Sequence, residues 1–213
     1  MPRADWKRQI VLFLTSQSLS MLGSMLVQYA LMWHLTLTTK SGEVMTLAVI
    51  VGFVPMFFIS PIGGVLADRL PKRLLIAAAD ALAAVSTLVL FIAAMLGHFG
   101  LTIILVAMAL RAVGQAIQGP AVGAILPDIV PEAHLLRING YNGSIQSGIG
   151  LVSPLMAGGL LAVMPIQWVL LIDVVTAALA IVVMLALVQT PDRPSDPDAD
   201  PTSPFHDMVD GLR

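Results

Sequence analysis

Three ionisable side chains, Asp80, Arg111 and Asp173, lie inside long apolar stretches of the sequence. A charge at the centre of a lipid bilayer costs about 2.5–3.5 kcal/mol on insertion scales, so such residues pair inside a protein or line a polar path. Arg111 is therefore either a cavity cation involved in proton coupling or half of a structural ion pair with a neighbouring acid or Gln115. Asp80 is either a proton carrier or a partner of nearby basic residues. Asp173 either titrates or caps or pairs near the outer interface.

Polar side chains recur at spacings of three and four residues, which place them on one face of a helix. The three stripes are Gln17, Ser20, Ser24 and Gln28; Arg111, Gln115 and Gln118; and Asn139, Asn142 and Gln146. Small polar stripes commonly join neighbouring helices, whereas amides together with an arginine favour a polar cavity. We expect the cavity-lining residues to be Gln17, Ser24, Gln28, Gln115, Gln118, Asn142 and Gln146.

One short stretch places an acid beside three cations at the end of an apolar run, and it reads Gly64-Val-Leu-Ala-Asp68-Arg69-Leu-Pro71-Lys72-Arg73. It allows two interpretations. Either it is a basic loop with an acid at a helix end, or it is a gating cluster formed by Gly64, Asp68, Arg69, Lys72 and Arg73.

The composition indicates the elements that must position these residues. Of 213 residues, 57% are hydrophobic and only 11% are charged, whereas soluble domains have about 45–50% apolar and about 25% charged residues. A membrane-crossing helix needs about 20 apolar residues, so the chain has enough for about six. Gly, Pro and charged clusters separate six apolar stretches, over 10–37, 44–66, 74–96, 101–126, 136–164 and 166–188. The sequence therefore predicts an all-α membrane protein and argues against a soluble enzyme.

Loop charges predict the orientation. With the N-terminus inside, the inner segments hold Arg3, Lys7, Arg8, Arg69, Lys72, Arg73, Arg137, Arg193 and Arg213, and the outer loops hold Lys40 alone. Cytoplasmic loops carry an excess of Lys and Arg, so we expect both termini in the cytoplasm of a multi-pass cell-membrane protein. The first apolar stretch exceeds the roughly 7–15 residues of a signal-peptide core, so we expect it to be retained.

The segment boundaries predict three parts. Residues 1–190 form the six-helix transmembrane domain, and the Pro/Asp-rich stretch over 191–204 is a disordered linker. A new segment begins at 205–213. Very short turns follow the third and fifth spans, so we expect spans three and four, and spans five and six, to form tight hairpins.

The sequence contains no motif for several common classes of functional site. There is no cysteine, which excludes disulfides and a thiolate nucleophile. There is no phosphate-binding loop, no zinc-binding His-Glu-x-x-His pair and no catalytic triad motif, and the four histidines lie on different segments. The net charge of −2 gives no sign of the basic surface that nucleic-acid-binding proteins carry. We therefore predict no enzyme activity, no catalytic residue, no metal site, no cofactor and no nucleic-acid partner.

The second and fifth spans share a faint pattern, Pro61-Ile-Gly63-Gly64 in one and Pro154-Leu-Met-Ala157-Gly158-Gly159 in the other. These spans are equivalent if the chain consists of two three-helix units. An odd number of spans per unit makes the units inverted, which is typical of transporters.

The 64–73 stretch resembles motif A of the major facilitator superfamily, which lies between the family's second and third helices. Pro71 departs from the usual glycine. Arg111 to Gln115 resembles motif B, and Gly150 to Gly159 resembles the antiporter motif C, with Ser153 and Ala157 in place of glycines around Pro154, Gly158 and Gly159. The whole chain resembles the macrolide-exporter-like branch of drug:proton antiporters, but covers only the first six of the family's twelve helices.

This resemblance implies the N-terminal half of a proton-coupled efflux transporter that exports amphipathic small molecules or drugs by alternating access. Motif A would latch the two halves on the cytoplasmic side, and 205–213 would begin an amphipathic helix leading to the second half. The implied partners are the lipid bilayer, a small-molecule substrate, protons and a C-terminal six-helix half from the same gene, a separate chain or self-association. The alternative is a non-transporting six-helix membrane protein that acts as a binding or assembly partner.

Overall fold

The computed structural model describes residues 5–188, which form six α-helices. They are α1 (Trp6–Thr39), α2 (Gly42–Arg69), α3 (Lys72–Met95), α4 (Leu101–Ile129), α5 (Glu132–Val163) and α6 (Ile166–Ala186). Each is long and apolar enough to cross a membrane, which confirms the predicted architecture. The predicted linker over 191–204 and the segment over 205–213 lie outside the described residues.

The helix ends follow local signals. Ser41 precedes α2, and its side chain accepts a hydrogen bond from the backbone N–H of Val44 at 3.4 Å, which satisfies one of the donors left free in the first turn. Lys40, just after α1, has a left-handed backbone with φ of 49°. Pro131 and Pro165 stand directly before α5 and α6, where a residue without a backbone N–H loses no hydrogen bond.

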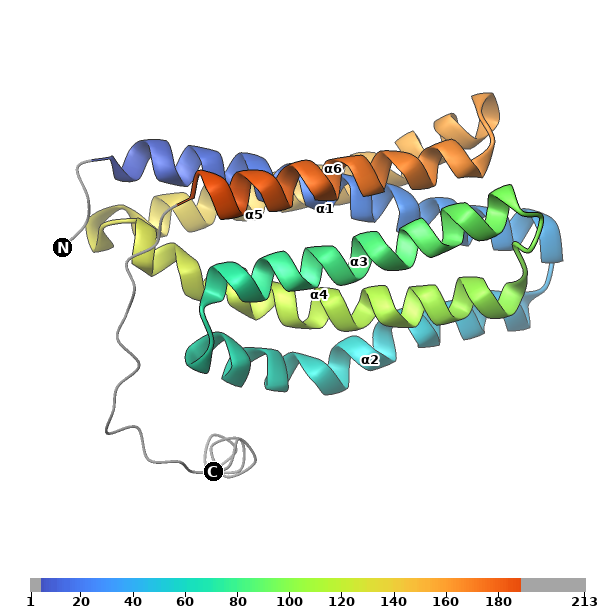
Figure 1. The fold of residues 1–213 in the computed structure, drawn as a ribbon, viewed down its shortest axis with the longest axis horizontal. Coiled ribbons are helices and arrows are strands. Elements are labelled where there is room, and N and C mark those ends of the chain that lie inside the picture. Colours follow the sequence, from blue (N-terminus) through green and yellow to red (C-terminus); the bar gives the residue numbers. More distant parts are fainter. Residues whose placement is uncertain (1–4, 189–213) are drawn as a thin grey trace.

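The helices form two interleaved three-helix units, α1–α3 and α4–α6. The middle helix of each unit packs mainly on the first helix of the other, so α2 lies on α4 and α5 lies on α1. In consequence α1, α5 and α6 lie on one side of the molecule, and α2, α3 and α4 on the other (Figure 1). If α1, α2 and α3 are exchanged with α4, α5 and α6, the main helix contacts stay the same: α2–α4 corresponds to α5–α1, and α3–α4 corresponds to α6–α1. Since each unit crosses the membrane three times, the units are inverted repeats, as predicted.

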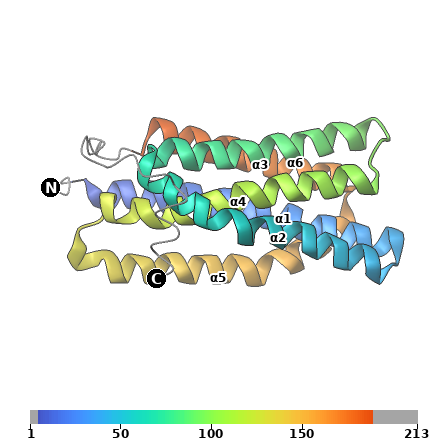
Figure 2. The same cartoon turned by 90° about the horizontal axis from the view of Figure 1, so that it is seen from below.

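One predicted hairpin is wrong. The helices α3 and α4 pack along each other, but α5 and α6 barely touch and lie on opposite sides of α1 in Figure 2. The turn between them consists of Met164 and Pro165, both with extended backbone. This turn directs α5 away from α6 and onto α1.

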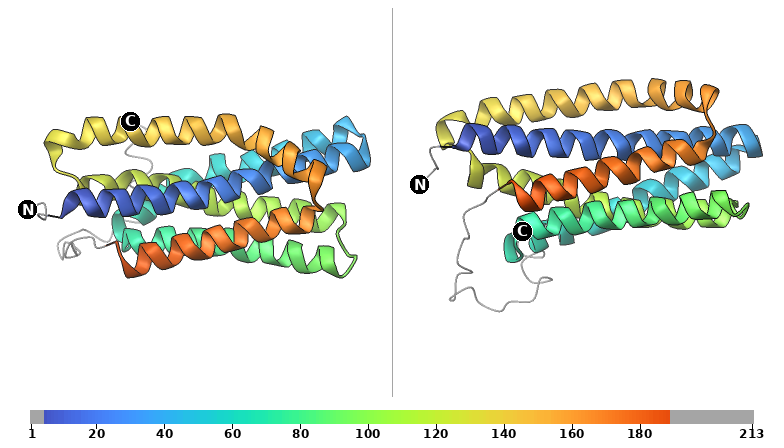
Figure 3. Two further views of the ribbon diagram at one scale, coloured as in Figure 1. Left: turned by 90° about the horizontal axis from the view of Figure 1, so that it is seen from above. Right: turned by 45° about the horizontal axis from the view of Figure 1, so that its top comes forward.

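Helices α2 and α5 are the most exposed elements. Only 6% of the most apolar window of α2 and 11% of that of α5 are buried, and α5 runs along an outer edge of the molecule (Figure 3). Their few buried residues are mostly small. A Cβ atom on Gly63 of α2 would lie 2.6 Å from the carbonyl oxygen of Ala116 in α4, and Ala157 of α5 is buried in an apolar cluster with Leu26 and Ala30 of α1.

Basic residues gather at one end of the bundle. The start of α1, the α2–α3 turn and the start of α5 carry Lys7, Arg8, Arg69, Lys72, Arg73 and Arg137. In the described chain, the turns at the opposite end carry Lys40 as their only lysine or arginine. The bundle therefore has the charge asymmetry on which the predicted orientation depends.

Candidate functional site

A polar layer crosses the centre of the bundle between two apolar clusters. The cluster at the basic end contains Phe13 and Ile76, and the cluster toward the other end contains Leu31 and Leu90. The buried polar residues between them come from α1, α3, α4 and α6 and include Gln17, Ser20, Asp80, Thr87, Arg111 and Asp173. Because apolar packing flanks the layer at both ends, its polar and charged groups depend on one another for hydrogen bonds.

Arg111 of α4 and Asp173 of α6 form an ion pair in this layer, with Nη1 and Oδ2 separated by 2.5 Å and both side chains fully buried. Thr87 of α3 donates to the same Oδ2 at 2.7 Å and also contacts the guanidinium. Arg111 further donates to the backbone carbonyl of Ser24 in α1 at 2.9 Å, and the Ser24 hydroxyl contacts Asp173 Oδ1 at 3.3 Å. One cation thus joins all four core helices.

Asp80 of α3 forms a second, separate polar cluster. Its Oδ1 accepts hydrogen bonds from the Ser20 hydroxyl at 2.5 Å and from Gln118 Nε2 at 2.7 Å. The same Gln118 nitrogen also contacts Gln17 Oε1 at 3.3 Å. These partners are neutral. Asp80 Oδ2 and Gln17 Nε2 are buried without a hydrogen-bond partner in the described part of the chain.

The structure brings together some of the predicted cavity residues and separates others. The α1 and α4 stripes meet at Gln17, Ser24 and Gln118, around the two buried acids. The remaining residues are Gln28 and Gln115, both half-buried, and Asn142 and Gln146 on the exposed helix α5. Gln28 lies against α2, because a Cβ on Gly52 would meet its side-chain nitrogen at 3.2 Å.

Two basic residues of the α2–α3 turn contact the ends of neighbouring helices. Lys72 donates to Asp128 Oδ2 at 2.6 Å and to the Ala124 carbonyl at 2.9 Å, both in α4. Arg73 donates to the carbonyls of Met184 and Leu185 at the end of α6, at 3.2 and 2.6 Å. These two cations therefore fix the start of α3 to the ends of its neighbours, where a positive charge complements the helix dipole.

Two other charged residues of that turn, Asp68 and Arg69, are exposed. Asp68 is exposed and forms no hydrogen bond or ion pair with the described residues. Arg69 is also exposed, and Gly64 has nothing within 4 Å of the position of a Cβ. The outer side of the turn thus presents an acid and a cation at the surface.

The Ser153–Gly159 stretch lies on the face of α5 that packs on α1. Ser153 and Ala157 are fully buried, and Pro154 and Gly158 are half-buried. A Cβ on Gly158 would lie 3.7 Å from Trp33 of α1, whereas Gly159 is exposed. The stretch therefore forms part of the α1–α5 contact.

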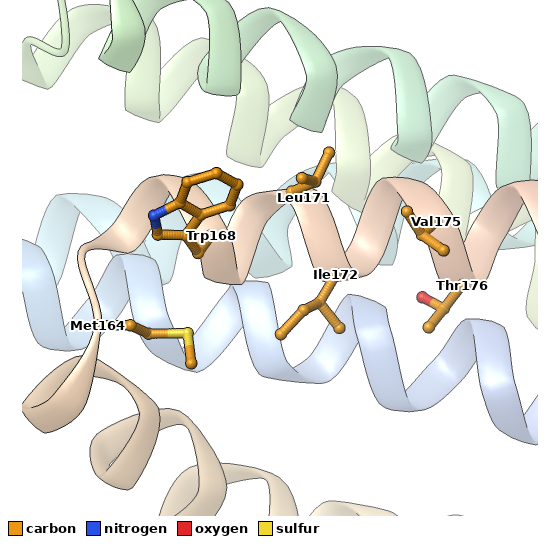
Figure 4. Close-up of a pocket in the computed structure, with 6 residues that line it drawn as sticks. All are labelled: Met164, Trp168, Leu171, Ile172, Val175 and Thr176. Atoms are coloured by element: carbon orange, nitrogen blue, oxygen red, sulfur yellow. The ribbon is translucent and has the colours of Figure 1, made fainter.

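A shallow groove of about 510 Å³ lies along α6, outside the polar layer (Figure 4). The lining residues are Met164, Trp168, Leu171, Ile172, Val175 and Thr176. It holds no ionisable side chain and offers an occupant mainly apolar contacts.

Sequence reasoning missed two residues of these clusters. Thr87, which bridges Arg111 and Asp173, stands seven residues after Asp80 on the same helix. This spacing returns to the same face and would have identified it. Asp128, in the last turn of α4, carries the charge opposite to that of Lys72 at the same end of the bundle, and that complementarity was the available signal. No group of acids or histidines in the described residues is arranged to hold a metal ion.

Comparison with known proteins gives two kinds of match. The family model described as Major Facilitator Superfamily matches residues 10–208. Macrolide efflux protein A of Streptococcus pyogenes is 32% identical over 187 residues, covering 88% of this chain and 46% of that protein. Macrolide efflux protein A of Enterococcus faecalis is 32% identical over 145 residues, covering 68% of this chain and 45% of that protein. The chain thus spans about half the length of the curated relatives it matches.

Proposed function

Since the chain belongs to the Major Facilitator Superfamily, a family of membrane transporters, we propose that it forms the N-terminal half of a drug efflux transporter. The observation that carries this proposal is the 32% identity over most of the chain to a protein named for macrolide efflux. The cargo is an amphipathic small molecule, exported across the cell membrane by alternating access of two six-helix halves.

The second half covers α2 and α5. These helices pack least within the bundle, and α5 exposes Asn139 and Gln146, whose amides would remain without hydrogen bonds in lipid. The matched relatives are about twice as long. Six further helices, from the same gene, a separate chain or a second copy, would provide the missing wall.

Energy comes from proton exchange through the central polar layer. Buried ionisable groups in membrane segments are costly and typically mark ion or proton pathways. The layer holds Asp80, Arg111 and Asp173 in two neighbouring clusters, and the flanking apolar clusters limit leakage of water through the core.

The α2–α3 turn acts as the latch between the halves. The exposed Asp68 contacts the second half, whereas Lys72 and Arg73 hold the turn rigid through their contacts with α4 and α6. The basic end of the bundle faces the cytoplasm, with both termini on that side.

The proposal is tested by drug accumulation in cells that express the full reading frame, with and without an uncoupler. The frame should lower accumulation, and the uncoupler should abolish this effect. Asp68→Asn and Arg111→Ala should each reduce export, whereas Glu43→Gln, at the opposite end and exposed, should not. Unchanged export in the first two variants would refute the site assignment, and no export at all would favour the non-transporting assembly partner.

A further inference from the structure

Among the three ionisable residues of the polar layer, Asp80 differs in lacking a cation. Asp173 has Arg111 at 2.5 Å, whereas the hydrogen bonds to Asp80 come from a hydroxyl and an amide. Asp173 of α6, a second acid in the same polar layer, adds a like charge nearby rather than a counter-charge. Asp80 is 98% buried, and a carboxyl group buried without a counter-charge is least costly in its neutral form.

The hydrogen bonds of Asp80 are arranged as for a carboxylic acid. Both donors, Ser20 and Gln118, contact Oδ1, and Oδ2 has no partner in the described structure. In a carboxylic acid one oxygen is a carbonyl acceptor and the other carries the proton. A carboxylate at this position would leave a buried, negatively charged oxygen without a donor, which costs more than a neutral one.

Each buried acid has one half-buried partner, Gln118 at Asp80 and Ser24 at Asp173. At Asp80 that partner is a neutral amide that can contact water outside the bundle. The side chains of Arg111 and Asp173 are both fully buried.

We propose that Asp80 is the group that binds and releases the transported proton, and that the Arg111–Asp173 pair stays charged and holds the helices together. This inference rests on the proposed proton-coupled efflux. In the loaded state the proton is bonded to Oδ2 and the side chain is neutral. On release the O–H bond breaks, its electron pair stays on the carboxylate, and the proton passes to water on the Gln118 side.

The test is infrared difference spectroscopy of the purified chain reconstituted in lipid bilayers, recorded while the pH is changed. A protonated carboxyl group in an apolar site gives a distinct C=O band. The band should titrate in the native chain and disappear in Asp80→Asn, whose amide keeps the acceptor for Ser20 and Gln118. It should remain in the Arg111→Gln/Asp173→Asn double variant. Asp80→Glu, a second control for folding, should restore the band at a shifted frequency.

Two results would overturn the proposal: a band that survives Asp80→Asn but is lost in the double variant, and a native chain without a titrating buried-acid band. Transport gives a separate readout. Asp80→Asn should abolish export against a gradient while retaining substrate exchange at equal concentrations, and retention of gradient-driven export would also count against Asp80. If the native protein exports nothing, the proposed function fails while the infrared result still decides the role of Asp80.

Discussion

Removing the acid of the buried ion pair is the sharpest perturbation that the structure offers. Asp173→Asn keeps the shape of the side chain but leaves Arg111 as an uncompensated charge in a site with no exposed surface. Breaking a buried pair by removing one partner costs about 3–5 kcal/mol in soluble proteins, and an arginine at the bilayer centre costs about 2.5–3.5 kcal/mol.

The remaining partners of Arg111 place the expected cost at the lower end. The guanidinium keeps its contacts with Thr87 and with the Ser24 carbonyl, although its Nε already lacks a partner in the described structure. We therefore expect a loss of about 3 kcal/mol, which is about a hundredfold in the unfolding equilibrium.

The matched control removes both charges. In Arg111→Met/Asp173→Leu neither charge of the pair remains, and the Thr87 hydroxyl, which lies 3.0 Å from the Ala83 carbonyl one turn earlier, can donate to that carbonyl instead. Replacing a buried ion pair by apolar residues of similar volume is often neutral or stabilising. We expect the double variant to lie within about 1 kcal/mol of the native chain.

The assay is equilibrium unfolding in mixed micelles with increasing dodecyl sulfate, followed by far-ultraviolet circular dichroism. Glu43→Gln, exposed at a helix end, provides a baseline within about 0.5 kcal/mol. The reasoning is refuted if Asp173→Asn costs less than about 1 kcal/mol, or if the double variant is as unstable as the single one.

Two further predictions concern packing and orientation. Gly63→Ala should destabilise the bundle by about 1–3 kcal/mol in the same assay, because its Cβ would overlap the α4 backbone. Gly64→Ala should leave the stability unchanged, because nothing lies within 4 Å of its Cβ position. Equal effects of the two substitutions would contradict a close approach of α2 to α4. Because the chain has no cysteine, single cysteines report orientation directly. A membrane-impermeant maleimide added to intact cells should label Gly42→Cys but not Leu70→Cys, and the reverse pattern would invert the proposed topology.

The helices were predictable because each combines a long apolar run with a local stop signal. The predicted stretch 74–96 and the observed helix Lys72–Met95 differ only at their ends. The α5–α6 hairpin was not predictable in the same way. A two-residue turn fixes which helices are joined. The helix against which α5 packs depends instead on how small residues of α5 such as Ala157 fit against Leu26 and Ala30 of α1, and sequence spacing does not encode this fit.

The sequence predicts which polar residues share one face of a helix, but not which residues of different helices contact each other. Helical spacing places Gln17 and Ser20 on one face. The cost of a buried charge left Arg111 as a cavity cation or as the partner of an acid or Gln115, and in the structure it pairs with Asp173. That cost did not identify which acid, because this depends on the depth of each helix in the bundle. Basic residues were one alternative for Asp80, but eight residues of helix place it about 12 Å from Lys72 along the axis, and Ser20 and Gln118 contact it instead.

The repeat symmetry explains why the two acids can have different roles. Asp80 follows the first residue of α3 by eight positions, and Asp173 follows that of α6 by seven, so inverted repeats bring equivalent acids into the centre from opposite ends. The fold thus provides two similar positions, and the surrounding side chains make them unequal. Asp173 meets an arginine from α4 of its own unit, whereas α1, the counterpart of α4, gives Asp80 only the hydroxyl of Ser20. Two ion pairs would also hold the helices together, but neither acid could then change its charge at low cost. With one acid paired to a cation and the other not, the bundle has both a fixed contact between helices and a group that can exchange a proton.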